Sequence, residues 1–421
     1  MQLTTPIVEW FRERKFPVPE HYNQSVMLRA SKRLNPHTLE ASLRVLCACH
    51  EMLRATWNGY GLTIRPLETA RLIGFWEHDF AGEVDPRVDV LKAAQRLQAE
   101  VDLANGPLMR AALFHMKDGD AVLIAIHHLV VDGVSWRVLT EDLASVYEQL
   151  LTGAFSARLQ RPRCTFAEYA GALGAYAKGE TLARELPYWK SVAEKVSKGV
   201  VKSDKSAKSA FLTVSVPAET TKALLTTAAA KLSAEANDLL LTALARAWKK
   251  VTGRGGLAVS LEGHGREAFG EKPLAIERVI GWFTTIYPVA LSATDGEATD
   301  DLLATAQMLR ASPGKGFGYG ALRYLGGHAE LAVQTEFTFN YLGSFDEGAS
   351  DKALFAMDRS LPQGDAVSPE NAGETPFALN CLNGPDGLTG RFDYDTSLMD
   401  EEKAKAFAAA FVQELSDFAH A

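Results

Sequence analysis

The sequence contains little cysteine, no long apolar run and no excess of basic charge. Its four cysteines among 421 residues are Cys47, Cys49, Cys164 and Cys381. They form no CxxC pair, so we expect free thiols in a reducing compartment, and neither a disulfide framework nor a metal site. No stretch approaches the about 20 apolar residues that span a bilayer, and residues 1–6 contain no basic or apolar leader. These absences predict a cytoplasmic protein without a membrane segment.

The charge balance also excludes a class of partner. Lysine and arginine number 44 against 52 acidic residues, and the formal net charge is −8. A mildly acidic chain is poorly suited to non-specific nucleic-acid binding.

The length of the chain predicts more than one lobe. Because 421 residues that are 47% hydrophobic exceed one core of ordinary size, we expect two lobes, residues 1–177 and 178–421. We expect the protein to be a monomer.

Hydrophobic periodicity in the first lobe predicts helices and a hairpin. Apolar residues at helical spacing favour helices over residues 36–51 and 91–101. Two apolar runs, 108–116 and 121–126, flank Asp118-Gly119, a strong hairpin turn. The second run is apolar throughout, which indicates a strand covered on both faces. Ser135 is expected to cap a helix that runs to about Leu151.

The second lobe mixes strands and helices without a regular alternation. We expect a helix ending at residues 187–190, a solvated mobile segment over 193–210, strands over 211–216, 257–261 and 332–341, and a helix over 239–250 capped by Asn237-Asp238. In the last strand, alternation places Val333, Thr335, Phe337, Phe339 and Tyr341 on one face. This mixture predicts α+β lobes, each a sheet with packed helices.

Two adjacent histidines, His127 and His128, end the apolar strand of the hairpin. Neighbouring residues on a strand point to opposite faces, so one histidine faces inward and needs a hydrogen-bond partner. Two satisfied core histidines remain an alternative to a catalytic pair. Asp132 is expected to lock the following loop, and Gly133 to permit a conformation that a side chain would forbid.

A second polar run, Glu262-Gly263-His264-Gly265-Arg266-Glu267, directly follows a predicted strand. Glycines on both sides of a histidine suggest a tight loop with an exposed polar tip. A surface turn with an ion pair is the alternative. We expect Arg266 to pair with Asp132.

These motifs resemble those of a known family. Residues 127–133, HHLVVDG, resemble the signature of the condensation-domain superfamily, which includes chloramphenicol-acetyltransferase-like acyl transferases. The extension to Trp136 and the run 262–267 resemble the epimerization domains of nonribosomal peptide synthetases, and condensation domains do not usually carry that run. Further resemblances follow in family order at residues 6–11, 237–241, 278–284, 313–320 and 339–346.

The resemblance implies a fold, a reaction and a partner. The fold would be two chloramphenicol-acetyltransferase-like lobes in a V-shape around a central channel. The reaction would be L-to-D epimerization of the α-carbon of an aminoacyl or peptidyl thioester during nonribosomal peptide synthesis. The substrate would be carried on the 4'-phosphopantetheine arm of an upstream peptidyl carrier protein, with a downstream condensation domain as a further neighbour. The domain itself would bind no cofactor or metal.

The resemblance also assigns roles to residues. His128 and Glu262 become the acid/base pair, and either could remove the proton from the L isomer. Asn340 and Tyr341 become candidates for orienting the thioester or stabilising an enolate. Independently of the resemblance, the helix that begins at Ser135 points its dipole at the loop and is a further candidate for stabilising an enolate. Strand alternation favours Asn340 and leaves Tyr341 as a core residue in the alternative interpretation. The residues expected to be structural are His127, Asp132, Gly133, Trp136 and Arg266.

Two other functions fit part of the pattern. The HHxxxDG motif alone permits an amide-forming condensation domain, and a module of the same fold could recruit partner proteins without catalysis.

Residues 313–320 are glycine-rich but match neither a P-loop nor a dinucleotide turn, so we expect a flexible loop there.

Overall fold

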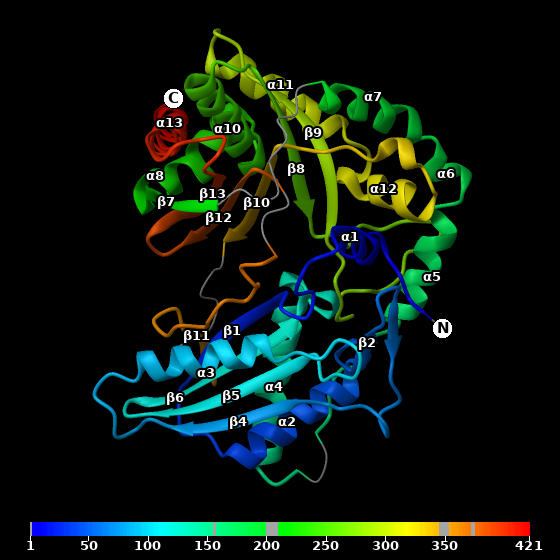
Figure 1. Cartoon of the computed structure of the whole chain (residues 1–421), viewed down its shortest axis with the longest axis vertical. Coiled ribbons are helices and arrows are strands. Elements are labelled where there is room, and N and C mark those ends of the chain that lie inside the picture. Colours follow the sequence, from blue (N-terminus) through cyan, green and yellow to red (C-terminus); the bar gives the residue numbers. More distant parts are fainter. Residues whose placement is uncertain (1, 155–156, 199–208, 345–352, 372–374) are drawn as a thin grey trace. The chain divides into compact units, whose positions relative to one another are not determined.

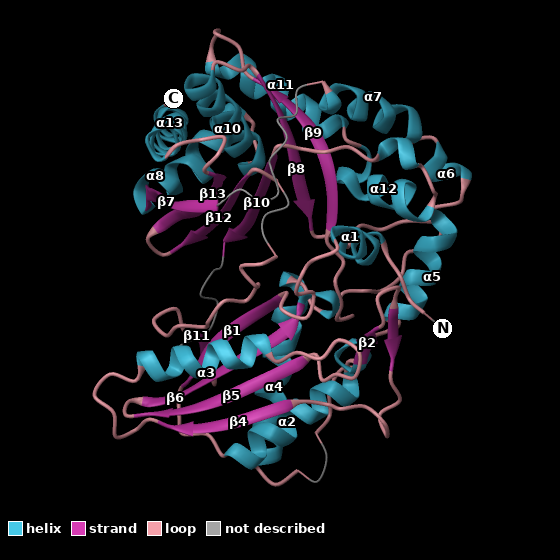
Figure 2. Ribbon diagram, viewed as in Figure 1, coloured by secondary structure: helices cyan, strands magenta, loops and turns pink. Residues whose placement is uncertain are grey.

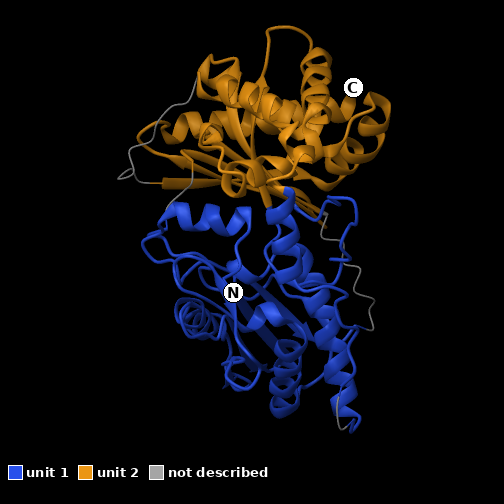
Figure 3. Ribbon diagram, turned by 90° about the vertical axis from the view of Figure 1, so that its right-hand side faces the viewer, with its two compact units in different colours: residues 1–176, 264–284, 347–372 blue, residues 177–263, 285–346, 373–421 orange. Residues whose placement is uncertain are grey.

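The computed structural model describes residues 2–154, 157–198, 209–344, 353–371 and 375–421. The chain forms two compact units (Figure 3). Unit 1 comprises residues 1–176, 264–284 and 347–372, and unit 2 comprises residues 177–263, 285–346 and 373–421. The first division, after residue 176, lies beside the boundary expected from the sequence. Two later segments belong to unit 1, so the units are discontinuous along the chain, whereas the sequence suggested a single boundary.

Unit 1 is built around a five-stranded sheet of order β11-β1-β6-β5-β4 (Figure 1). Strands β4 and β5 are parallel and the other neighbours are antiparallel. The elements of unit 1 are α1 (Pro6–Arg14), β1 (Asn23–Ala30), α2 (Pro36–Cys49), η1 (Glu51–Arg54), β2 (Ala55–Trp57), β3 (Leu62–Ile64), β4 (Gly74–Asp79), α3 (Arg87–Ala99), β5 (Met109–Met116), β6 (Gly119–His127), η2 (His128–Val130), α4 (Gly133–Leu151), α5 (Phe166–Tyr176) and β11 (Phe355–Met357).

Both faces of the unit 1 sheet are buried. On one face, Leu123 of β6 and Phe114 of β5 share a core with Val90 and Leu97 of α3. Figure 2 shows α3 on that face and α2 and α4 on the other. Ile124, on the second face of β6, is also buried. The prediction of a strand covered on both faces is therefore confirmed.

Unit 2 contains a six-stranded mixed sheet of order β7-β13-β12-β10-β8-β9. Strand β10 is parallel to β8 and β12, and the remaining neighbours are antiparallel. The elements of unit 2 are α6 (Glu180–Ala183), α7 (Leu186–Ser197), β7 (Ser209–Pro217), α8 (Ala218–Ala223), η3 (Leu224–Ala228), α9 (Ala229–Leu232), α10 (Ala236–Thr252), β8 (Gly256–Gly263), β9 (Thr285–Ser292), α11 (Ala298–Ala311), η4 (Pro313–Gly316), α12 (Phe317–Gly320), η5 (Ala321–Leu325), η6 (Ala329–Leu331), β10 (Phe337–Ser344), β12 (Phe377–Gly384), β13 (Gly387–Asp395) and α13 (Glu401–His420).

Aromatic side chains fill the core of unit 2. Phe337 of β10 and Phe392 of β13 stack with ring centroids 6.0 Å apart, and Phe407 of α13 lies 4.5 Å from Phe392. Trp248 of α10 packs edge-on against Phe377 of β12 at 4.9 Å. Such contacts bury large apolar areas, which is the main force that holds helices to a sheet. Each unit is thus a mixed sheet with packed helices, and the predicted α+β class is confirmed.

Three predicted element boundaries are wrong. Residues 187–190 begin helix α7 instead of ending one, because Pro187 is tolerated in a first helical turn. Helix α10 begins at Ala236 with Glu235 as its cap, and the Asp238 carboxylate accepts a hydrogen bond from the Glu235 backbone N–H at 2.8 Å. The cap is therefore two to three residues earlier than Asn237-Asp238.

The third error concerns the strand expected over residues 332–341. Strand β10 begins only at Phe337, so Val333 and Thr335 lie outside it. The intervening Glu336 is fully buried and forms a two-point ion pair with Arg254, at 2.7 and 3.0 Å. A buried carboxylate needs such a partner. This pair interrupts the alternation that the sequence suggested.

The lysine-rich segment predicted over 193–210 lies partly outside the described residues. Its first five residues belong to α7, where Ala193 and Val196 are buried, and residues 209–210 begin β7. Those parts are ordered elements and not the predicted mobile segment. None of the helices in the described ranges is long and apolar enough to cross a membrane.

Candidate active site

The histidine loop joins β6 to α4 in unit 1. His127 is the last residue of β6, and His128 begins a short 3-10 turn. Helix α4 then begins at Gly133 with Asp132 as its cap, since the Asp132 Oδ1 accepts the Ser135 backbone N–H at 2.7 Å. The predicted cap, Ser135, is wrong, because the aspartate at the next suitable position upstream satisfies the free N–H groups first.

Gly133 also lacks the expected backbone conformation, one that a side chain would forbid. Gly133 has no positive φ, it is exposed as the first residue of α4, and a Cβ there would meet no atom within 4 Å. A side chain at this position is therefore compatible with the backbone. The glycine leaves open space beside the loop without being required by its conformation.

His127 is the inward-facing histidine. Its side chain is fully buried, its Nε2–H donates to the Pro19 carbonyl at 2.8 Å, and its Nδ1 accepts the Leu129 backbone N–H at 3.2 Å. Burial lowers the pKa of His127 to about 3. The prediction that one histidine would point inward and find a partner is confirmed, and His127 is held neutral.

His128 lies in a different environment. Its Nδ1 lies 2.9 Å from the Val131 carbonyl, and its Nε2 lies 2.9 Å from the side-chain nitrogen of Gln24. The Trp282 ring lies 4.1 Å away between centroids and the Tyr22 ring 5.8 Å away. Burial among these groups lowers the pKa of His128.

Sequence reasoning missed three of these neighbours, among them Tyr22. Gln24 belongs to β1, a strand that we did not predict, and Trp282 was noted only as part of the run 278–284. A usable signal exists for Gln24, because Asn23-Gln24-Ser25 places three polar residues directly before the apolar Val26-Met27-Leu28. Polar residues at the end of a buried strand need partners, and they often line a site.

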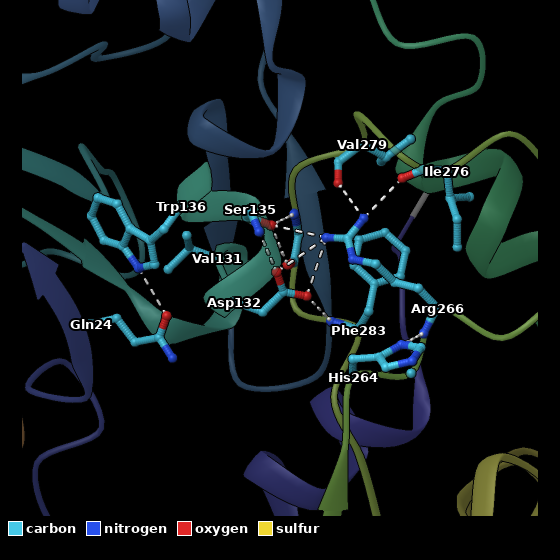
Figure 4. A network of polar contacts seen from close by, with 12 residues as sticks. Gln24, Val131, Asp132, Ser135, Trp136, His264, Arg266, Ile276, Val279 and Phe283 are labelled. Carbon is cyan, nitrogen blue, oxygen red and sulfur yellow. Dashed lines mark hydrogen bonds and ion pairs between the residues drawn. The ribbon is translucent and has the colours of Figure 1, made fainter. Parts of the chain in front are cut away.

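Asp132 and Arg266 form the ion pair that the sequence predicted (Figure 4). One Arg266 Nη lies 3.1 and 3.2 Å from the two Asp132 oxygens, and the other donates to the Ile276 and Val279 carbonyls at 2.9 and 3.0 Å. The guanidinium also stacks over the Phe283 ring at 3.9 Å. Both charged side chains are nearly buried, with 8% and 5% exposed. The pair therefore fastens segment 264–284 to the histidine loop.

Ser135 contributes to the same network. Its hydroxyl donates to the Gly281 carbonyl at 3.1 Å and accepts from the Gly281 N–H at 3.2 Å and from Arg266 at 3.1 Å. The side chain is fully buried. These contacts saturate the hydroxyl, so its observed geometry is that of a link between α4 and residue 281.

Trp136, which follows Ser135, points to a different neighbour. Its indole N–H donates to the Gln24 Oε1 at 2.9 Å. Trp136 is buried, and Gln24 contacts both this tryptophan and His128. The residue that distinguishes the epimerization-like extension of the motif is therefore connected to His128 through one glutamine.

The loop after β8 depends on a glycine. Gly265 has φ +66°, and a Cβ there would lie 1.6 Å from the Phe283 carbonyl oxygen. Before it, the exposed His264 accepts the Arg266 backbone N–H through Nδ1 at 3.0 Å. His264 also lies 3.3 Å from Glu267. The tight loop with a polar tip, predicted from the sequence, is present.

Glu262 and Asn340 meet in unit 2. Glu262 lies near the end of β8, and β10 runs parallel to β8 with Phe339 beside Leu261. The next residue on each strand is therefore adjacent, and the Asn340 Nδ2 donates to Glu262 Oε2 at 3.0 Å. Both side chains are partly buried. The sequence assigned both to one site, and the parallel register brings them together.

Tyr341 does not pack as deeply as its strand neighbours. Phe337 and Phe339 are almost fully buried, whereas Tyr341 is partly exposed. Strand β10 is irregular between Tyr341 and Ser344, with Gly343 at φ +76°. The last two residues of the expected motif, Phe345 and Asp346, lie outside the described residues.

The glycine-rich run 313–320 is a tight turn, with Gly314 and Lys315 in the left-handed region, followed by one helical turn, so the expectation of a flexible loop is wrong. It forms η4 and α12, and residues 317–320 are buried. A Cβ on Gly316, whose φ is +86°, would lie 2.1 Å from the Tyr287 ring, and one on Gly318 would lie 2.1 Å from Glu185. These glycines allow the turn to pack closely against neighbouring elements.

The four cysteines are free, as predicted. Burial raises the pKa of Cys47 and of Cys381 to about 12. Within the described part of the chain, no group of three or more His, Cys, Asp or Glu side chains is arranged to hold a metal ion. Among the predicted site residues, His128 belongs to unit 1, whereas Glu262 and Asn340 belong to unit 2.

Comparison with known proteins gives the family. Residues 4–421 match the family described as Condensation domain. The chain belongs to the condensation-domain family. Surfactin synthase subunit 1 of Bacillus subtilis (strain 168) is 38% identical over 97% of the chain, which spans 12% of that subunit. Gramicidin S synthase 1 of Brevibacillus brevis is 33% identical over 98% of the chain, which spans 39% of that protein.

Two solved structures resemble this condensation-domain family member over its whole length. The epimerization domain from the third module of tyrocidine synthetase B superposes with a TM-score of 0.89 at 30% identity, covering 100% of this chain and 96% of that one. The first condensation domain of the calcium-dependent antibiotic synthetase, in complex with a substrate analogue, gives a TM-score of 0.75 at 19% identity, covering 100% and 96%. The second likeness shows a shared fold.

Proposed function

We propose that this condensation-family domain epimerizes the α-carbon of an aminoacyl or peptidyl thioester held on a carrier protein. The observation that carries the proposal is the Glu262 carboxylate at the end of β8, contacted by the Asn340 amide at 3.0 Å. A carboxylate of this kind can supply a second proton carrier, in addition to the histidine of the HHxxxDG motif. The likeness to a solved epimerization domain over the whole chain supports the same conclusion.

The reaction needs two proton carriers. One removes the α-proton, and the electron pair of that C–H bond moves onto the thioester carbonyl to form an enolate. The other then donates a proton to the opposite face of the α-carbon, which inverts it. We assign the two transfers to His128 and Glu262, and each reverses its role when the D isomer is the substrate.

The supporting residues follow from their contacts. The Asn340 amide fixes the orientation of one Glu262 oxygen, and Tyr341, one residue later on β10, is the proposed donor that orients the thioester or stabilises the enolate. The 264–284 segment, fastened by Arg266, places Trp282 against the His128 ring. Preorganisation of this kind lowers the barrier because the groups need not rearrange during the reaction.

The substrate side is also a proposal. A thioester on the 4'-phosphopantetheine arm of an upstream peptidyl carrier protein matches the chemistry, because a thioester acidifies the α-proton more than an amide does. In the full synthetase, the D-configured product would pass to a downstream condensation domain. The relatives of this chain are far longer synthase subunits, which fits such an arrangement.

The proposal is tested with a loaded carrier protein in deuterated water. After incubation with this domain, the amino acid is released and its deuterium content and chirality are measured, starting separately from the L and D forms. We expect one deuterium at the α-carbon and a mixture of isomers from either start. Glu262→Gln should slow this exchange by about 100-fold or more, the usual contribution of a general acid or base.

Glu267→Gln is the matched control, because Glu267 lies in the same run and forms an ion pair with the exposed His264. It should retain the wild-type rate. Amide formation between two carrier-bound substrates, without α-deuteration, would instead identify a condensation domain. If the folded domain catalyses neither reaction with any loaded carrier, that result would favour a recruitment module and overturn the proposal.

A further inference from the structure

Gln24 of β1 connects His128 in the histidine loop to Trp136 in the helix that follows it. It shares a face of β1 with Val26 and Leu28, and in the antiparallel register it lies opposite Ile126, one residue before the histidines. Its Oε1 accepts the Trp136 indole N–H at 2.9 Å (Figure 4), and its Nε2 lies 2.9 Å from the His128 Nε2. The side chain is thus a bridge from α4 to the histidine.

Chemistry fixes the direction of every hydrogen bond in this chain. An indole N–H only donates, so the carbonyl of the Gln24 amide must face Trp136. The NH₂ end of that amide therefore faces His128, and because it only donates, the His128 Nε2 must accept with its lone pair. At the other side of the ring, the Val131 carbonyl only accepts, so the His128 Nδ1 must carry the proton.

One tautomer alone satisfies both contacts, the neutral form with hydrogen on Nδ1. A proton on Nε2 would place two donors face to face at the Gln24 amide. Turning the amide would relieve this at His128 but would bring its NH₂ against the Trp136 N–H, which also only donates. Trp136 therefore prevents Gln24 from adapting to a charged histidine.

The groups around His128 shift its pKa in both directions. Asp132, on the cap of α4, favours the charged form, although it is itself paired with Arg266. Tyr22, directly before β1, and His127 on β6 are further titratable neighbours, and the Trp282 ring contacts the imidazole from segment 264–284. Burial outweighs Asp132 and lowers the pKa of His128.

We propose that Gln24, oriented by Trp136, is a positioning residue that holds His128 as the neutral Nδ1–H tautomer and presents Nε2 as the proton acceptor. This inference rests on the proposed epimerization. Before reaction, the Gln24 amide occupies the Nε2 lone pair, and the substrate C–H displaces it. When Nε2 takes the α-proton, the locked amide disfavours the resulting cation, which makes His128 a ready proton donor in the direction of the reaction that reprotonates the α-carbon from its side.

The tautomer is tested first on the substrate-free protein. With ¹⁵N-labelled histidine, the His128 signals are assigned by their loss in His128→Asn and followed through a pH titration. We expect an unprotonated Nε2 and a protonated Nδ1 at neutral pH. An Nε2–H tautomer, or a charged ring at neutral pH, would overturn the inference.

Variants of Gln24 then test its part in setting that state. Gln24→Leu removes the donor to Nε2, and the titration midpoint of His128 should rise by about one pH unit, the order expected from one hydrogen bond. Gln24→Glu is nearly isosteric, keeps an acceptor for Trp136 and places an anion at Nε2, so the midpoint should rise by about two units. Trp136→Phe frees the amide to turn its carbonyl toward a charged His128, and should raise the midpoint at least as much as Gln24→Leu.

The same variants should move the reaction in parallel. The acidic limb of the kcat profile should shift upward by the same amount as the His128 midpoint, and Gln24→Glu should recover activity at high pH with KM little changed. A structural role alone would lower activity equally at all pH values. If exchange occurs but Gln24 variants leave the midpoint unchanged, this inference fails. If the tautomer is found but no carrier-bound substrate exchanges, the proposed function fails instead.

Discussion

Single residues in this domain are constrained by what surrounds them more than by the motif in which they stand. Gly133 and Gly265 both belong to family-like runs, yet their environments are opposite. Gly133 lies exposed at the start of α4 with open space where a Cβ would go, whereas Gly265 has φ +66° and its Cβ position is filled by the Phe283 carbonyl.

This contrast predicts different outcomes for the same substitution. Gly133→Ala should leave the free energy of unfolding unchanged or raise it by up to about 1 kcal/mol, because alanine reduces the freedom of the unfolded chain and suits a helix. Gly265→Ala should destabilise the protein by more than about 2 kcal/mol, through a positive φ and a backbone collision. Urea denaturation followed by circular dichroism measures both, and equal effects at the two sites would contradict the geometry.

At the scale of elements, the cap of α4 is also an anchor for a distant segment. The Asp132 carboxylate accepts the Ser135 N–H of its own helix at 2.7 Å, the Phe283 N–H at 3.2 Å and the Arg266 guanidinium. One carboxylate thus begins the helix and holds residues 264–284. Because that segment carries Trp282, the position of the ring against His128 depends on the same ion pair.

A double-mutant cycle tests this anchor. Asp132→Asn and Arg266→Met should each lower the free energy of unfolding by about 3 kcal/mol, since each leaves a nearly buried charge without its partner. The double variant should cost less than the sum, with a coupling of about 1–3 kcal/mol. Additive effects in denaturant unfolding would show that the two side chains act independently. Lys403→Met, in an exposed pair with Asp400, provides a control with an expected effect below about 1 kcal/mol.

At the scale of the whole molecule, unit 1 is assembled from three separate stretches of chain (Figure 3). The third stretch contributes β11, which pairs with β1 at the sheet edge. The second contributes Arg266 to Asp132 and the close approach of Gly281 to the Phe166 ring. Residues 1–176 therefore contain most of the sheet of unit 1 and lack several of its closing contacts.

A fragment of residues 1–176 should not fold by itself. It would expose the edge of β1 and leave the buried Asp132 carboxylate without its arginine, and both losses favour aggregation or a loosely packed state. We expect poor dispersion of amide resonances and no cooperative thermal transition, with the full chain as the control. A sharp transition and a dispersed spectrum from the fragment would show that the two later segments are dispensable.

The sequence by itself determined several of the local elements and named the candidate residues. The apolar run of β6, the helices α2 and α4, and the strands β7 and β8 follow from periodicity, because side-chain spacing reports burial directly. The partnership of Asp132 with Arg266 was also predictable, since it follows from the general rules of charge pairing. The preference for Asn340 over Tyr341, which comes from strand alternation, stays a prediction.

Tertiary structure alone decided how distant segments combine. Periodicity carries no information about which strands pair, so the return of residues 264–284 and 347–372 to unit 1 and the strand β1 were not foreseen. The same holds for Gln24, whose role depends on lying between Trp136 and His128, which are separated from it by more than a hundred residues of chain. A hydrogen bond has a direction set by its two partners, and only the folded chain brings those partners together.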